Sequence, residues 1–336
     1  METRPAFRTN RAVAASALVF GLLVSTNAAV ASSAFDTYPE REITLIMPMP
    51  PAGPTDQLGR LLADHLGRQL GKQVIVANRP GAGGAVGATA AAQSPADGYT
   101  LLFGNSAALA GSPAIYKNLA YDPVKSFKPI SPISTGHMVI VVGASSPIHS
   151  LSDLVRLSKD KPGTLNYGSA GNGSPLHIGG ELLKMRSGAD LTHIPYKGGA
   201  PALLGLLSGD VQIGIDLLPP LLPHLETGKI RALAVAGPDR LPMIPDVPTA
   251  AEAGIPGVEL NLFTALVAPA GLPEPIAKKL NDAVKKIFNT PEFKEVADRN
   301  SFFLAETGSL EEAERFIQEQ VAQWAESVEI ANARVD

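Results

Sequence analysis

The sequence predicts an α/β fold of two lobes, with parallel-rich sheets and a ligand cleft between the lobes. Apolar runs of strand length alternate with helical patterns across short connections, and this alternation occurs in two successive series. Glycine-rich turns follow several of the strands, where open parallel sheets hold their ligands. If the two lobes face each other, these turns line one cleft, as in binding proteins that close about a hinge.

Residues 1–31 predict a signal peptide. Three arginines precede an apolar run over residues 12–24, and Ala29-Val30-Ala31 has the small-x-small pattern of a cleavage site. The apolar run is too short to cross a bilayer as a stable helix. We therefore expect export to the periplasm, with a mature chain that begins at Ser32; an uncleaved anchor is the alternative.

The composition narrows the classes of partner. Acidic residues outnumber basic ones by 32 to 28, which disfavours nucleic acid and anionic membranes as main partners. The chain has no cysteine, so disulfides, thiolate metal sites and a lipid-bearing cysteine are excluded. A small anionic ligand needs only a local positive potential and remains compatible with this balance.

The stretch 43–66 predicts a strand, a rigid loop and a helix. Residues 43–47 form a β-branched apolar run, and the prolines that follow stop it. Leucines then recur at helical spacing from Leu58 to Leu66, and Thr55 or Asp56 is expected to cap this helix. The loop aims backbone N–H groups and a positive dipole end at one point, which suits an anion, although an ordinary βα unit has the same pattern.

The remaining elements follow in order. In the first series we expect strands at 73–78 and 100–105 and a small-residue helix at 85–92. The second series has strands at 138–143, 165–169, 191–196, 211–216 and 229–236, with helices between them. A proline-rich connector at 238–257, a strand at 260–268 and two or three helices close the chain, the last with a capping box at Ser309 and Glu312.

The sequence contains little that indicates an enzyme. The glycines at 81–87 depart from the dinucleotide-binding spacing, no serine lies in a G-x-S-x-G motif, and the histidines lack metal-binding spacing. His177, after a glycine-rich turn, is expected to bond a ligand or the neighbouring loop, whereas His193 is expected to be a packed structural histidine. Asp216, at a strand end, either contacts the ligand or holds a loop. An exported hydrolase or isomerase that uses His177 with Asp216 remains the competing class.

Several blocks together carry a family resemblance. They follow in order as YPEREITLIMPMPPAGPTD (38–56), VANRPGAGGAVG (76–87), ADGYTLLFGN (96–105), HIPYKGGAPAL (193–203), GKIRALAVAG (228–237), IPDVPTAAEAGIPG (244–257) and APAGLP (268–273). The chain resembles the periplasmic solute-binding receptors of tripartite tricarboxylate transporters, the Bordetella uptake gene family. The resemblance spans nearly the whole mature chain and is specific through the number of its blocks.

The resemblance implies a fold, a ligand and a partner. The fold would be the type II periplasmic-binding-protein (Venus flytrap) fold, with lobe 1 at 32–136 plus 258–336 and lobe 2 at 137–257. The ligand would be a small organic carboxylate, held by backbone N–H groups, hydroxyls and water, with no cofactor, metal or catalytic residue. The receptor would be a monomer and would deliver the ligand to a two-component integral-membrane permease. A module that signals to a membrane sensor is a further alternative.

The family's motifs also imply the contact residues. Carried over to this sequence, they are Pro51, Ala52, Gly53, Thr55, Asp56, Gly83, Gly84, Asn105 and Ser106 in lobe 1, and Ser169, Ala170, Gly171, Asn172, Gly173, Ser174, His177, Tyr196, Lys197, Gly198 and Asp216 in lobe 2. This chain departs from the pattern at Ala52, where the family usually has glycine, and at Phe263, where tryptophan is common. The methyl group of Ala52 bears on the size and pose of the ligand more than on the fold.

Overall fold

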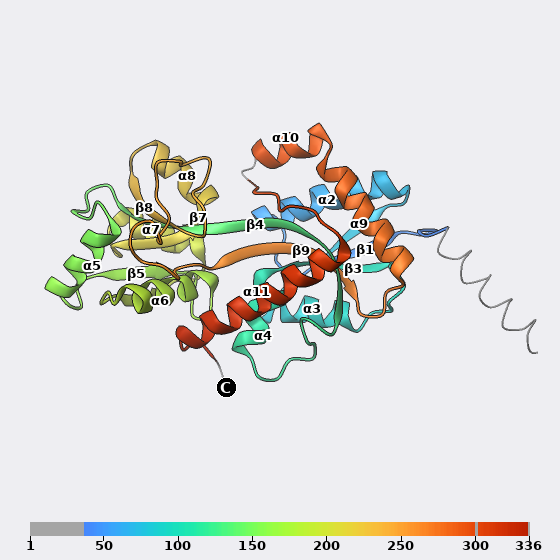
Figure 1. The fold of residues 1–336 in the computed structure, drawn as a ribbon, viewed down its shortest axis with the longest axis horizontal. Coiled ribbons are helices and arrows are strands. Elements are labelled where there is room, and N and C mark those ends of the chain that lie inside the picture. Colours follow the sequence, from blue (N-terminus) through green and yellow to red (C-terminus); the bar gives the residue numbers. More distant parts are fainter. Residues whose placement is uncertain (1–36, 300–301, 335–336) are drawn as a thin grey trace, which may run out of the picture. The chain divides into compact units, whose positions relative to one another are not determined.

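The computed structural model describes residues 37–299 and 302–334 (Figure 1). The chain divides into two units, Met1–Glu40 and Arg41–Asp336, and the fold described here is that of the second unit. The predicted signal peptide and its cleavage site lie outside the described residues.

The described residues form a mixed sheet, which confirms the predicted α/β class. Its strands lie in the order β2-β1-β3-β9-β4-β7-β5-β6, and β8 pairs with β4 beside this path. Their bounds are β1 Ile43–Met47, β2 Val74–Asn78, β3 Thr100–Asn105, β4 Phe127–Gly143, β5 Asn166–Ser169, β6 Thr192–Pro195, β7 Ile213–Leu217, β8 Ile230–Ala236 and β9 Asn261–Pro269. β1 is parallel to β2 and β3, β5 is parallel to β6 and β7, and β4 and β9 run antiparallel to their neighbours.

One long strand, β4, joins the two parts of the sheet. Residues Phe127 to His137 pair with β9, and residues Met138 to Gly143 pair with β7 and β8. The sequence pattern indicated a strand only from residue 138, because Pro129 and Pro132 cannot donate to a ladder. The register of the β4–β9 pair shifts beside both prolines, which is how the strand accommodates them. The predicted lobe boundary at 136–137 falls where β4 changes partners, and the division into lobes itself stays a prediction.

The helices agree closely with the periodic patterns. Their bounds are α2 Pro54–Leu70, α3 Ala85–Ala92, α4 Ser112–Ile115, α5 Leu151–Asp160, α6 Pro175–Ser187, α7 Gly199–Ser208, α8 Leu218–Glu226, α9 Glu274–Phe288, α10 Pro291–Arg299 and α11 Leu310–Ile330, with a short 3₁₀ turn η1 at Ala82–Gly84 and a π-helical turn η2 at Ala107–Gly111. The capping box that opens α11 at Ser309 and Glu312 is confirmed. The expected capping of α2 by Thr55 or Asp56 is wrong, because Gly53 is its N-cap and no side chain caps it.

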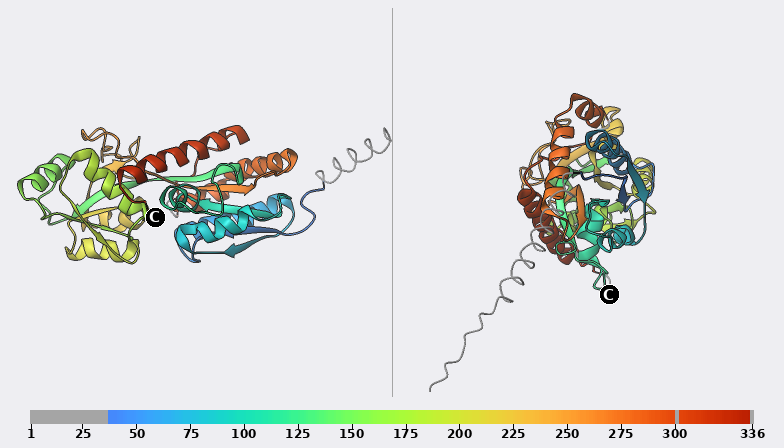
Figure 2. Two further views of the ribbon diagram at one scale, coloured as in Figure 1. Left: turned by 90° about the horizontal axis from the view of Figure 1, so that it is seen from below. Right: turned by 90° about the vertical axis from the view of Figure 1, so that its right-hand side faces the viewer.

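The C-terminal helix α11 packs along β4 (Figures 1 and 2). Its Trp324 is 1% exposed, and the indole Nε1 donates a hydrogen bond to the Asn261 carbonyl at the start of β9, at 3.0 Å. Trp324 belongs to an apolar cluster that also contains Ile46 of β1, Ile140 of β4 and Leu182 of α6. This one core therefore includes residues from both ends of β4.

Candidate ligand-binding site

Asp56 fixes the loop that precedes α2. Its carboxylate is 2% exposed and accepts hydrogen bonds from the Ala52 N–H at 3.0 Å, from Arg60 Nε at 2.8 Å and from Asn78 Nδ2 at 2.8 Å. Burial acts to raise the pKa of Asp56, but the hydrogen bonds from Arg60, Asn78 and the Ala52 N–H together lower it below its usual value. Asp56 is thus an ionised brace for the loop, and its contact with a ligand stays a prediction.

A first pocket, of about 180 Å³, lies where the first turns of four helical segments meet. Thr55 comes from α2, Ala107 from η2, Pro175 from α6 and Pro219 from α8. The pocket brings together three of the predicted contact residues, Thr55, Asn105 and Ser106. Its other lining residues are Leu58, Ser134, Thr135, Gly136, Leu217, Leu262, Phe263, Thr264, Phe302 and Phe303.

Two polar side chains at the β3–η2 corner are available to a ligand in this first pocket. Ser106 is 4% exposed, and its hydroxyl has no hydrogen-bond partner among residues 37–299 and 302–334. Asn105 Oδ1 accepts the Ala108 N–H at 3.0 Å. This bond does not use the two N–H donors of Asn105 Nδ2, which can bond a ligand. Because the Ser106 hydroxyl lines the pocket and bonds no other described side chain, it can bond a ligand or water there.

A second pocket, of about 520 Å³, adjoins the first through Ala107 and Pro175, which line both. It brings together five more predicted contact residues, Gly83, Asn172, Gly173, Ser174 and His177. Ser174 caps α6 by accepting the His177 N–H at 3.3 Å, so the glycine-rich turn is tied to the helix it precedes. Trp324 and Arg334 line its far side, and Arg334 is ion-paired with Glu329 at 3.8 Å.

The remaining predicted residues line neither pocket. They are Pro51, Ala52, Gly53, Asp56, Gly84, Ser169, Ala170, Gly171, Tyr196, Lys197, Gly198 and Asp216. Gly84 is buried where a Cβ atom would lie 2.8 Å from the Ala108 Cβ, which explains the glycine without a ligand. Asp216 lines a separate small cavity with Gly168 and Ala202, and its Oδ1 accepts the Leu217 N–H at 2.8 Å. For these residues, contact with a ligand stays a prediction.

Three rings stack behind the glycine-rich turn at residues 170–174. The His193 ring lies between those of His177 and Tyr167, with centroid distances of 4.1 and 5.0 Å, so His193 is the packed histidine that the sequence predicts. Burial lowers the pKa of His193 to about 4, and burial also lowers the pKa of His177. His177 Nδ1 accepts the Gly173 N–H at 3.1 Å, so this ring braces the turn as a neutral imidazole.

The serine–histidine pair in this stack is not arranged for nucleophilic catalysis. Ser169 Oγ lies 2.6 Å from His193 Nε2, the distance expected of a nucleophile and its base. The Ser169 side chain is completely buried, however, and substrate cannot reach a hydroxyl at 0% exposure. His177 and Asp216, the pair suggested for an exported enzyme, line different cavities.

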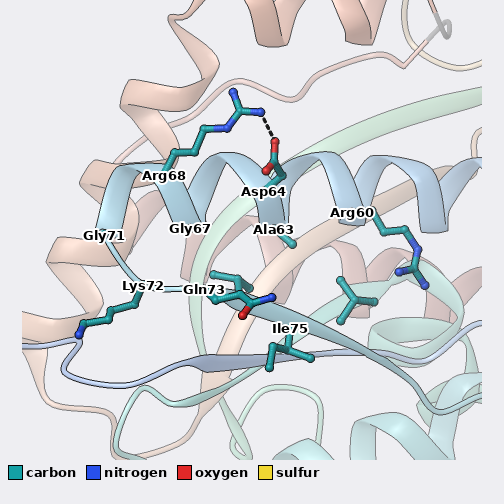
Figure 3. Close-up of a pocket in the computed structure, with 11 residues that line it drawn as sticks. Arg60, Ala63, Asp64, Gly67, Arg68, Gly71, Lys72, Gln73 and Ile75 are labelled. Carbon is teal, nitrogen blue, oxygen red and sulfur yellow. Dashed lines mark hydrogen bonds and ion pairs between the residues drawn. The ribbon is translucent and has the colours of Figure 1, made fainter.

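A further hollow is an open groove of about 680 Å³ between α2 and β2 (Figure 3). None of the predicted contact residues lines it. Its arginines are already paired, Arg60 with Asp56 and Arg68 with Asp64 and Glu292. The two adjoining pockets therefore form the better candidate site.

Within residues 37–299 and 302–334, no group of His, Asp and Glu side chains is placed to hold a metal ion. No helix in the same residues is long and apolar enough to cross a membrane.

Sequence reasoning missed much of the pocket walls. Ser134 and Thr135 of β4, Thr264 of β9, Pro219 of α8 and Phe303 have no motif that marks them. Their one local signal is position, since Ser134 and Thr135 directly precede Gly136, the last residue before the predicted lobe boundary.

Comparisons with known proteins give the same assignment as the blocks. The family model described as "Tripartite tricarboxylate transporter family receptor" matches residues 58–332. Protein BugT of Bordetella pertussis is 39% identical over 264 residues, 78% of this chain and 81% of its own length. A solved R. palustris protein with adipate has 34% identity and a TM-score of 0.77, covering 89% of this chain and all of its own. MatC of Rhodopseudomonas palustris, with bound malate, has 32% identity and a TM-score of 0.73, covering 87% of this chain and all of its own. This chain therefore belongs to the tripartite tricarboxylate transporter receptor family, and its fold is that of the family's periplasmic binding proteins.

Proposed function

We propose that the protein is a periplasmic solute-binding receptor that captures a small carboxylate in the two adjoining pockets and does not alter it. Its family and the adipate and malate in two structural relatives support a carboxylate ligand. The proposal includes the two lobes, 32–136 plus 258–336 and 137–257, which would close over the ligand. It also includes export by the signal peptide, a monomeric receptor, and delivery to a two-component membrane permease.

The observation that carries the proposal is the start of α2 in a pocket wall beside the side chains of Asn105 and Ser106. α2 begins at the wall that holds Asn105 and Ser106, and the five-residue turn η2 follows Ser106 directly. Each favourable helix N-terminus stabilises an anion by roughly 0.3–1 kcal/mol, and by more where water is excluded. A carboxylate there would accept hydrogen bonds from the Ser106 hydroxyl and the Asn105 amide without a cationic side chain.

The alternative functions have less support. An exported enzyme would need a base that reaches its substrate, and the separate cavities of His177 and Asp216 do not supply the suggested pair. A receptor that signals to a membrane sensor would use the same site, and capture of the membrane partner by the ligand-loaded receptor separates it from one that feeds a permease.

A thermal-shift panel tests the proposal on the purified exported protein, with aliphatic and aromatic carboxylates and neutral sugars. A carboxylate at about 100 times its Kd should add roughly 2.7 kcal/mol to the free energy of unfolding, which gives a clear rise in melting temperature. Ser106→Ala should weaken every binding carboxylate about tenfold, because a hydrogen bond to a charged group is lost. Ser145→Ala, on an exposed turn, is the matched control and should leave binding unchanged.

Two results would contradict the proposal. One is a flat response to every acid that persists after unfolding and refolding, a step that removes any co-purified ligand. The other is a carboxylate whose affinity is the same for the parent and for Ser106→Ala.

A further inference from the structure

The first pocket has a polar end and an apolar end. Thr55, Asn105 and Ser106 gather at the starts of α2 and η2 and carry hydroxyl or amide donors. The side formed by the start of α8 is lined by Leu217 and Pro219, and Pro175 of α6 and Leu262 of β9 continue this wall. The two ends therefore offer different chemistry to the two ends of a ligand.

The start of α8 offers few donors although it is a helix N-terminus. Pro219 and Pro220 occupy its second and third positions, and proline has no N–H. Pro175 removes the first N–H of α6 in the same way. α2 also lacks its first N–H, at Pro54, so the donors that distinguish the two ends are the side chains of Thr55, Asn105 and Ser106.

Among the described residues that line the first pocket there is no Lys, Arg, Asp or Glu. Arg334 lines the adjoining pocket and not the first, and His177 accepts rather than donates at Nδ1. A second carboxylate at the apolar end would be buried without a cation. An α-ammonium group would be buried without an acid, because Asp216 lines a separate cavity. Burying an unpaired charge is among the largest penalties in binding.

The middle of the first pocket likewise offers no charged partner to a ligand. The Ser134 hydroxyl and the Thr264 hydroxyl lie 2.7 Å apart and bond each other. Phe263 is 2% exposed, and Phe302 and Phe303 add further aromatic surface to the lining. The volume of about 180 Å³ suits a short aliphatic chain or a single ring.

We infer that the preferred ligand is a monocarboxylate with an apolar body, whose carboxylate lies at Ser106 and Asn105 and whose body packs against Pro175, Leu217, Pro219 and Leu262. This inference rests on the proposed function, since it assigns the chemical class of the ligand at that same site. It sets this chain apart from the two relatives solved with the diacids adipate and malate.

Three acids of equal chain length test the inference by calorimetry on the purified exported protein. Hexanoate ends in a methyl group, adipate in a second carboxylate and 6-aminohexanoate in an ammonium group. Hexanoate should bind at least about tenfold more tightly than either of the others, because only its far end needs no partner. Benzoate against terephthalate repeats the comparison with a flat ring.

A variant should reverse the preference. Leu262→Arg places a cation at the apolar end and should tighten adipate while weakening hexanoate, and Leu262→Met is the neutral control that keeps the original order. Ser106→Ala should weaken hexanoate and adipate by the same factor, because it acts at the shared carboxylate.

The outcomes separate the inference from the proposed function. Adipate binding as tightly as hexanoate, or more tightly, would overturn the inference and leave the carboxylate receptor intact. An unchanged order of affinities in a Leu262→Arg variant that melts normally would overturn the inference in the same way. Failure of every monoacid and diacid to bind would overturn the proposed function together with the inference.

Discussion

At the scale of the residue, Asp216 is the clearest case of a charge that the fold penalises. Burial raises its pKa to about 6 from the usual 3.8, and one hydrogen bond from the Leu217 N–H opposes this only in part. The folded state therefore binds a proton that the unfolded chain releases between pH 3.8 and 6. The contribution of Asp216 to stability is highest below this window, falls as the pH rises through it and stays low above it.

Asp216→Asn should therefore raise the free energy of unfolding above pH 6, by about 3 kcal/mol, and should change it little near pH 3.8. Urea unfolding at both ends of this range measures the difference. Asp160→Asn, on the exposed last residue of α5, removes the same charge as a control. An equal effect of Asp216→Asn at the two pH values would show that the carboxyl group is not penalised by burial.

At the scale of the element, the loop that opens α2 contains a strained residue. Ala52 has a φ of +73°, in the left-handed region where a Cβ atom is unfavourable by roughly 1–2 kcal/mol. The loop is held in this conformation because the Ala52 N–H donates to the buried Asp56 carboxylate. A glycine at this position would adopt the same backbone without strain.

Ala52→Gly should raise the free energy of unfolding by about 0.5–1 kcal/mol, because the relief of strain exceeds the extra entropy of the unfolded chain. Urea unfolding measures it. Ala322→Gly in the exposed face of α11 should do the opposite and lower stability by about 1 kcal/mol. A loss of stability in both variants would mean that the loop bears no strain at Ala52.

At the scale of the whole molecule, Trp324 is expected to report on ligand binding. It is the only tryptophan of the chain, it lines the second pocket, and it is hydrogen-bonded to Asn261 at the start of β9. If the lobes close about β4 and β9, the surroundings of the indole change with them. Saturation with hexanoate should therefore shift or quench the tryptophan emission, with the midpoint that calorimetry gives.

Trp324→Phe should abolish this fluorescence signal without abolishing the heat of binding, because the indole lines the second pocket and not the first. Calorimetric binding of hexanoate with no change in Trp324 emission would count against closure that reaches α11.

The sequence by itself determined the local structure and the family. β1 and β3 have the predicted bounds, and the cap of α11 lies at the predicted Ser309. These features depend on neighbours in the chain, such as side-chain period, a missing proline N–H and a hydroxyl two or three residues before a free amide. The seven sequence blocks, which follow one another in the family's order, identified the family.

Only the tertiary structure decided which residues meet in the site. Thr55, Asn105, Pro175, Pro219 and Leu262 come from five separate elements, and no spacing in the chain relates them. It also separated Asp216 from His177 and buried Ser169 beneath the turn it precedes. The physical reason is that the course of β4 and β9 through both parts of the sheet sets where the helix starts converge, and that course depends on packing between segments far apart in the chain.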